Sequence, residues 1–157
     1  MSRNSIGFAN ELATLDERVV TLPTGTTTLD PAKHANRLLQ MSTADAAYTI
    51  NLPRTTGSGD IYRFLSTIAR TSGSIVINAV SSPTSNKFVG RVLNFGSGNV
   101  LNSFASTTND IFTLNITTTG GALAGDYLEI QDVAVDTWRV VRGIVYSSGA
   151  HATSFSG

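Results

Sequence analysis

The residues that could support acid–base or metal chemistry are few and scattered. There are two histidines, His34 and His151, and neither lies in an HExxH, HxH or other ligand spacing. The chain has no cysteine, which excludes disulfides and thiolate metal sites, and none of its serines lies in a GxSxG motif. The sequence therefore predicts no enzyme activity, no cofactor and no metal site, and both histidines are expected at the surface.

Four carboxylates lie close together near the C-terminus, at Asp126, Glu129, Asp132 and Asp136. A glycosidase would need two of them facing one another, but the alternation of a strand places Asp126 and Glu129 on opposite faces. Asp132 and Asp136 flank an expected turn, and the spacing of a calcium-binding EF-hand loop is absent. This pattern favours turn-forming and solvating roles over catalysis.

The composition restricts the class of partner. The 157 residues suit a single domain with its own core, and 11 basic residues balance 11 acidic ones, so nucleic acid is not an expected partner. Only 14% of the residues are charged, against about 25% in an average soluble domain, while 17 serines and 21 threonines supply hydroxyl groups. This composition suits either a β-protein with threonine-rich solvent faces or a surface that stays bound to another protein.

No apolar run approaches the ~20 residues of a membrane span, and the N-terminus lacks the apolar region of a signal peptide. We therefore expect a soluble protein that is made in a cytoplasm and has no membrane partner.

The N-terminal segment, residues 1–18, differs from the rest of the chain. Its apolar residues recur at roughly helical spacing, which predicts a short amphipathic helix or an arm. These residues cannot form a core alone, so we expect the segment to contact a neighbouring protein or a sister subunit. The alternative is a flanking helix that packs on its own β-sandwich. The contact candidates are Arg3, Ile6, Phe8, Leu12 and Leu15.

From Val19 onward the apolar period changes to two, and turn residues separate short runs rich in valine, isoleucine, threonine and aromatics. Strands are predicted near 19–22, 26–29, 37–42, 47–52, 60–69, 74–80, 87–94, 99–104, 110–116, 126–132 and 137–146. Asp30-Pro31 predicts an N-cap and one or two helical turns across 31–36. So many short strands favour an all-β domain over 19–157, a jelly-roll-like β-sandwich with a short C-terminal tail.

Two turns are specified by their residue types. Glycines 57 and 59 lie in a loop where a positive φ is expected, and we predict that Tyr48–Leu52 and Ile61–Leu65 pair as antiparallel strands across it. The run from Asp132 to Asp136 predicts a hairpin with a loop of three to five residues. Trp138, the only tryptophan, is expected in the core.

Two stretches of sequence carry a resemblance to a known family. The first runs from Tyr48 to Phe64 (YTINLPRTTGSGDIYRF), and the second combines Asn115–Gly121 (NITTTGG), Gly125–Ile130 (GDYLEI) and Asp136–Val140 (DTWRV). With the tail ATSFS at 152–156, they resemble small capsid decoration, or cement, proteins of tailed bacteriophages. The similarity spans roughly residues 26–157 and its motifs are turn and strand signatures.

The resemblance implies a jelly-roll-like β-sandwich that binds the outside of the assembled phage head and stabilises contacts between major capsid proteins. It implies a location in the virion, with the major capsid protein as partner. Low charge and abundant valine, isoleucine and threonine leave apolar strand faces or edges that a monomer would expose, so we expect a homo-oligomer, a trimer rather than a dimer. Related domains of head fibres and tails provide an alternative, a β-domain that binds host surface glycans. An enzyme is a more distant third interpretation.

Overall fold

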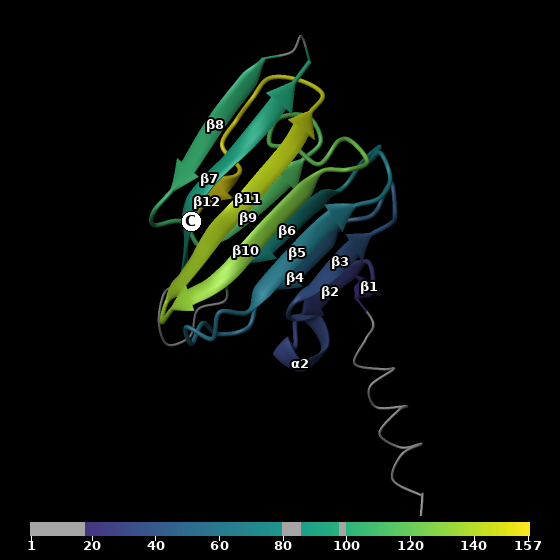
Figure 1. The fold of residues 1–157 in the computed structure, drawn as a ribbon. Coiled ribbons are helices and arrows are strands. Elements are labelled where there is room, and N and C mark those ends of the chain that lie inside the picture. Colours follow the sequence, from purple (N-terminus) through teal and green to yellow (C-terminus); the bar gives the residue numbers. More distant parts are fainter. Residues whose placement is uncertain (1–17, 80–85, 98–99) are drawn as a thin grey trace, which may run out of the picture.

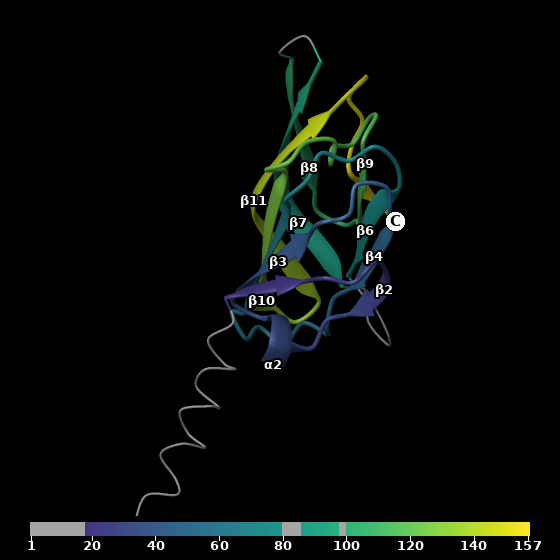
Figure 2. The same ribbon diagram turned by 90° about the vertical axis from the view of Figure 1, so that its right-hand side faces the viewer.

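The computed structural model describes residues 18–79, 86–97 and 100–157, which form two β-sheets packed face to face (Figures 1 and 2). The larger sheet has the order β1 (Val19–Thr21), β3 (Arg37–Met41), β5 (Ile61–Ser66), β10 (Tyr127–Ala134), β11 (Thr137–Ser147), β7 (Lys87–Gly96) and β8 (Leu101–Ser106). The smaller sheet has the order β12 (Phe155–Ser156), β9 (Ile111–Asn115), β6 (Ser74–Asn78), β4 (Tyr48–Asn51) and β2 (Gly25–Thr28). The predicted all-β sandwich is confirmed, and each of the eleven predicted strands is present.

The first six strands form a stack of three coils. The chain alternates between the two sheets, so that β1, β3 and β5 enter the larger sheet while β2, β4 and β6 enter the smaller one. Within each sheet, consecutive coils pair in parallel: Leu38 lies beside Val19 and Arg63, and Thr49 lies beside Thr26 and Val76. This half of the domain is therefore built like a short solenoid, in which each coil contacts its neighbours along the stack.

The predicted antiparallel pairing of Tyr48–Leu52 with Ile61–Leu65 is wrong. β4 belongs to the smaller sheet and β5 to the larger one, because the 53–60 connection crosses the sandwich instead of reversing within a sheet. The jelly-roll order is not confirmed either. A jelly roll is antiparallel throughout, whereas five of the ten strand pairings in the described chain are parallel.

The β10–β11 hairpin joins the coil stack to the rest of the larger sheet. β10 pairs antiparallel with β5 on one side, and β11 pairs parallel with β7 on the other. The predicted hairpin is confirmed, although its connection is only Val135–Asp136, with Asp136 at a positive φ of 60°. The C-terminal tail adds β12, a strand that the sequence pattern did not indicate, to the edge of the smaller sheet.

The only helix of the described residues, α2 (Pro31–His34), confirms the predicted N-cap. The Asp30 side chain accepts a hydrogen bond from the Ala32 N–H at 3.0 Å, and Pro31 occupies the first helical turn. His34 Nδ1 lies 2.9 Å from the Asp30 backbone N–H and accepts its hydrogen bond. The single turn closes the connection from β2 to β3 at one end of the sandwich (Figure 1).

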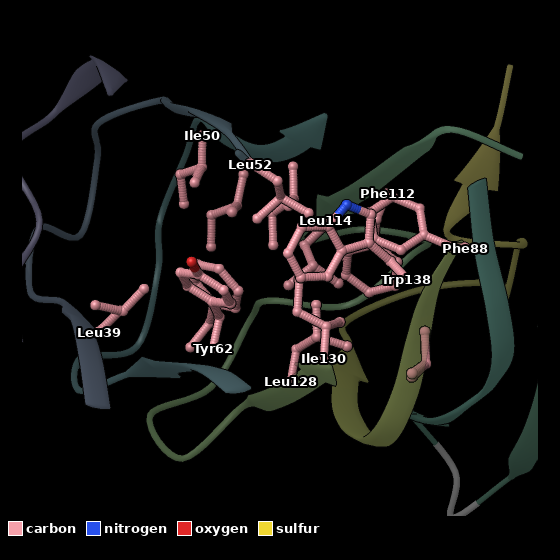
Figure 3. Close-up of a cluster of buried hydrophobic side chains, with 14 of the residues drawn as sticks. Leu39, Ile50, Leu52, Tyr62, Phe88, Phe112, Leu114, Leu128, Ile130 and Trp138 are labelled. Carbon is pink, nitrogen blue, oxygen red and sulfur yellow. The ribbon is translucent and has the colours of Figure 1, made fainter. Parts of the chain in front are cut away.

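The inward faces of both sheets interlock in one hydrophobic core (Figure 3). Trp138 is 1% exposed, which confirms its predicted burial, and its ring meets Tyr62 edge to face at 5.5 Å. Phe88, Phe112 and Phe155 form a second aromatic cluster, so the C-terminal strand contributes to the core directly. The phenylalanine cluster joins the two sheets, because Phe88 lies in the larger sheet and Phe112 and Phe155 in the smaller one, and burial of each large aromatic side chain is worth a few kcal/mol.

Candidate interaction surface

The outward face of the larger sheet carries two adjoining rows of apolar side chains. Strand register places Leu65, Tyr127, Ile144 and Leu93 side by side, and Tyr146, Phe95 and Leu101 form the next row. Ile144, Leu93, Phe95 and Leu101 are 36–50% exposed, while Leu65 and the two tyrosines are half-buried. These seven side chains, called the apolar rows below, form a continuous patch on five neighbouring strands.

Basic side chains gather beside the apolar rows on the same face. The outward positions of β5, β7 and β11 contribute five of them, called the basic group below: Arg63, Lys87, Arg91, Arg139 and Arg142. Among the described residues of this sheet, Glu129 is the only acidic side chain at an outward strand position. A chain with no net charge therefore carries a locally positive face.

Glu129 links the basic group to the apolar rows. Its Oε2 atom lies 3.4 Å from Arg63 Nε and accepts a hydrogen bond from the Tyr127 hydroxyl at 2.6 Å. Burial, followed by the Glu129 contact, raises the pKa of Tyr127 to about 12, so the phenol stays protonated at neutral pH and donates this bond. These contacts hold the Tyr127 ring in place on the sheet face.

Asp126 anchors the end of the sheet that carries the two tyrosines. Its carboxylate accepts hydrogen bonds from the backbone N–H groups of Tyr146 at 3.0 Å and Leu123 at 3.2 Å, which ties the start of β10 to the end of β11. The residue is 7% exposed, and burial raises its pKa to about 6 although these N–H groups favour the charged form. A buried acid thus positions Tyr127 and Tyr146.

Asp132 anchors the loop at the opposite end of β10. Its carboxylate accepts hydrogen bonds from the backbone N–H groups of Thr56, Gly57 and Ser58 and from both hydroxyls of this segment, at 2.8–3.2 Å. Gly57 and Gly59 have φ values of 77° and 84°, as predicted, which lets the loop curl around the acid. The sequence indicated a turn-forming role for Asp132, but not a partner some 75 residues away.

The other residues with possible chemistry remain apart. His34 lies in α2 and His151 lies with its Nδ1 atom 2.5 Å from Asn102 Nδ2, and both side chains are partly exposed. No group of three or more histidine, aspartate or glutamate side chains in the described chain is arranged to hold a metal ion. The contact candidates Arg3, Ile6, Phe8, Leu12 and Leu15 lie outside the described residues.

Comparison with protein-family models, with curated proteins and with solved structures yields no match to this chain. Within the described residues, no helix has the length and apolar character needed to cross a bilayer. The surface is therefore interpreted from its own chemistry. Sequence reasoning missed it because the residues come from five strands and meet only through strand register, although their alternation with buried residues was a usable signal.

Asp132→Asn is expected to destabilise the protein by about 2–4 kcal/mol, because an amide cannot replace all the charge-assisted bonds that the loop makes to the carboxylate. Burial alone would raise the pKa of Asp132, but the N–H groups of Thr56, Gly57 and Ser58 outweigh it and lower that pKa. Its stabilising effect is therefore present above the pKa of an unfolded aspartate and is lost as the pH falls. Urea unfolding measures the change.

Asp45→Asn, at an exposed carboxylate, is the matched control for this measurement and should change stability by less than about 0.5 kcal/mol. Equal unfolding midpoints for the two variants would show that contacts other than Asp132 hold the 55–58 loop.

Asp126 should make the protein less stable as the pH rises from about 4 to about 6. In this window the unfolded acid has lost its proton while the folded one retains it, so unfolding becomes more favourable, by at most about 3 kcal/mol. Above about pH 6 the contribution is constant. Unfolding free energies of the wild type and of Asp126→Asn, measured from pH 4 to 7, isolate it, because the amide carries no titrating proton. A difference between the two proteins that does not change with pH would contradict this assignment.

Proposed function

We propose that this chain is a structural virion protein, a decoration or cement subunit that binds the outside of a phage head and bridges neighbouring major capsid proteins. It acts there as a non-enzymatic clamp and is made in the cytoplasm of the host. The resemblance of its turn and strand motifs to such proteins supplies the phage context. The observation that carries the proposal is the outward face of the larger sheet, where the apolar rows and the basic group lie side by side.

The apolar rows suit a protein partner. Four of their members are at least 36% exposed although they lie on regular strands, where a polar residue would serve solubility better. Fully burying an exposed side chain of this size is worth about 1.5–3 kcal/mol, and these are already half covered, so each contributes roughly half of that value to an interface. Together they offset the cost of ordering a small interface. Many identical copies on one particle would reinforce the shell collectively even if each contact is weak.

The basic group defines the expected partner surface. Five basic side chains beside one carboxylate favour a capsid surface that presents acidic residues around an apolar centre. Hydrogen-bonded strands of one sheet carry both halves of the face side by side, so a partner can engage them together. The outward face of the smaller sheet offers a contrast: its strand positions carry uncharged residues such as Thr49, Asn51 and Thr113.

A second candidate is recognition of host glycans by a head-fibre or tail domain. The observation in its favour is the presence of three aromatic side chains, Tyr127, Tyr146 and Phe95, on the same face, because aromatic rings stack on sugars. Neighbouring Leu93, Ile144 and Leu101 favour a protein partner instead, since a sugar offers aliphatic side chains few complementary groups.

Ile144→Asp is expected to weaken attachment to purified phage heads that lack this protein by about 10- to 100-fold, because it places a charge at the centre of the apolar rows. Its side chain is 43% exposed, so thermal unfolding should change little. Raising the salt concentration from about 0.05 to about 0.5 M should also weaken wild-type attachment by screening the basic group. Co-sedimentation with the heads measures both effects.

Thr113→Asp, at an outward position of the smaller sheet, is the matched control and should attach like the wild type. Loss of attachment in Thr113→Asp but not in Ile144→Asp would assign the contact to the other face. Failure of the wild type to sediment with heads, together with binding to host polysaccharide, would favour the glycan-binding alternative.

A further inference from the structure

β8 is an unusual edge strand. It pairs only with β7 in the described sheet and lies at the lateral edge of the sandwich (Figure 1). The other three sheet edges are short strands of two to four residues, whereas β8 has six, LNSFAS, with no charge, no proline and no bulge in its register. Natural proteins use charges, prolines and bulges to block pairing at a sheet edge, and β8 has none of these three features.

The register identifies which backbone groups of β8 face the open edge. The Gly96 N–H donates to the Val100 carbonyl at 3.0 Å, so the pair formed by residues 96 and 100 is hydrogen-bonded across the β7–β8 ladder. Bonded and non-bonded pairs alternate in an antiparallel ladder, so Leu101, Ser103 and Ala105 form the non-bonded pairs with β7. Their N–H and C=O groups therefore point away from β7 toward the free edge.

We infer that β8 pairs antiparallel with β8 of a second copy, across a two-fold axis that passes through Ser103, and joins the two larger sheets into one. This register sets Ser103 opposite its own copy and Leu101 opposite Ala105. It engages the backbone groups of Leu101, Ser103 and Ala105, which point to the free edge of each strand, and gives six new backbone hydrogen bonds. Shifting the axis by one residue in either direction leaves one of the three without a partner and yields four bonds.

The side chains of β8 support a second copy as the occupant. A two-fold axis brings each residue near its own copy, so a charge on the strand would repel itself, and β8 has none. Leu101 and Val100 are 50% and 51% exposed, and Phe104 is only partly buried against the core. A neighbouring strand would cover Leu101 on the outward face and the part of Phe104 that the core leaves exposed on the inward face.

The expected assembly is a dimer, because an isologous contact closes at two copies. It differs from the trimer that the sequence favoured. The pairing also extends the apolar rows of one copy into those of the other, since Leu101 and Phe95 lie next to the shared edge. A contact of one strand per copy is small, so we expect dissociation in the micromolar range.

Sedimentation equilibrium of the full chain between about 1 and about 200 µM should show a monomer–dimer equilibrium. Ser103→Lys places two like charges on the axis and should shift it at least tenfold toward monomer. Thr28→Lys, at an exposed site on the edge strand of the other sheet, should leave it unchanged. A monomer throughout this range, a trimer, or equal dimerisation of wild type and Ser103→Lys would overturn the inference.

Cysteine cross-linking tests the register directly, because the chain has no cysteine of its own. Ser103→Cys should form a disulfide-linked dimer under mild oxidation, since bonded antiparallel partners lie about 5.5 Å apart, within disulfide range. Ala105→Cys alone should not, because its copy would lie four residues away, about 13 Å along the strand. Mixing Ala105→Cys with Leu101→Cys should produce the cross-linked heterodimer. Cross-linking of Ala105→Cys to itself but not of Ser103→Cys would refute this register. None of these outcomes depends on attachment to capsids.

Discussion

The pairing of β10 with β5 is the constraint on which the rest of the molecule depends. It joins two halves that are built differently, a stack of parallel coils formed by β1 to β6 and a sheet of longer strands formed around β7 and β11. Asp126 ties one end of β10 to β11, and Asp132 ties the other end to the loop that joins β4 to β5 within the coil stack. The rings of Trp138 and Tyr62 meet on the core side of this pairing. The outward face is continuous because β10 and β5 pair along their length.

The pairing of β10 with β5 also explains the composition of the candidate surface. One apolar row crosses the larger sheet from β5, in the coil stack, to β7 through three strand pairings. It consists of Leu65, Tyr127, Ile144 and Leu93. Directly beside it, Arg63, Glu129 and Arg142 form the next row across the same strands. The apolar rows and the basic group are thus fixed relative to one another by backbone register, so a partner meets both at once.

Much of the fold could be predicted from the sequence because local signals specify strands and turns. Alternation located each of the eleven strands, Asp30-Pro31 located the helix, and the two glycines located a loop with positive φ. Alternation does not report the direction of a neighbouring strand, so the parallel coils were missed and β4 was paired with β5. Charge counting failed in a similar way: 11 basic and 11 acidic residues indicate neutrality, whereas strand register concentrates five basic residues on one face.

The central claim is that the outward face of the larger sheet is the surface that attaches to a phage head. A cryo-electron microscopy reconstruction of the virion at side-chain resolution tests it most directly. The account predicts this chain on the outside of the capsid, with the apolar rows and the basic group in contact with the major capsid protein. A reconstruction in which the chain is found in the tail, or on the head with this face turned to solvent, would contradict it.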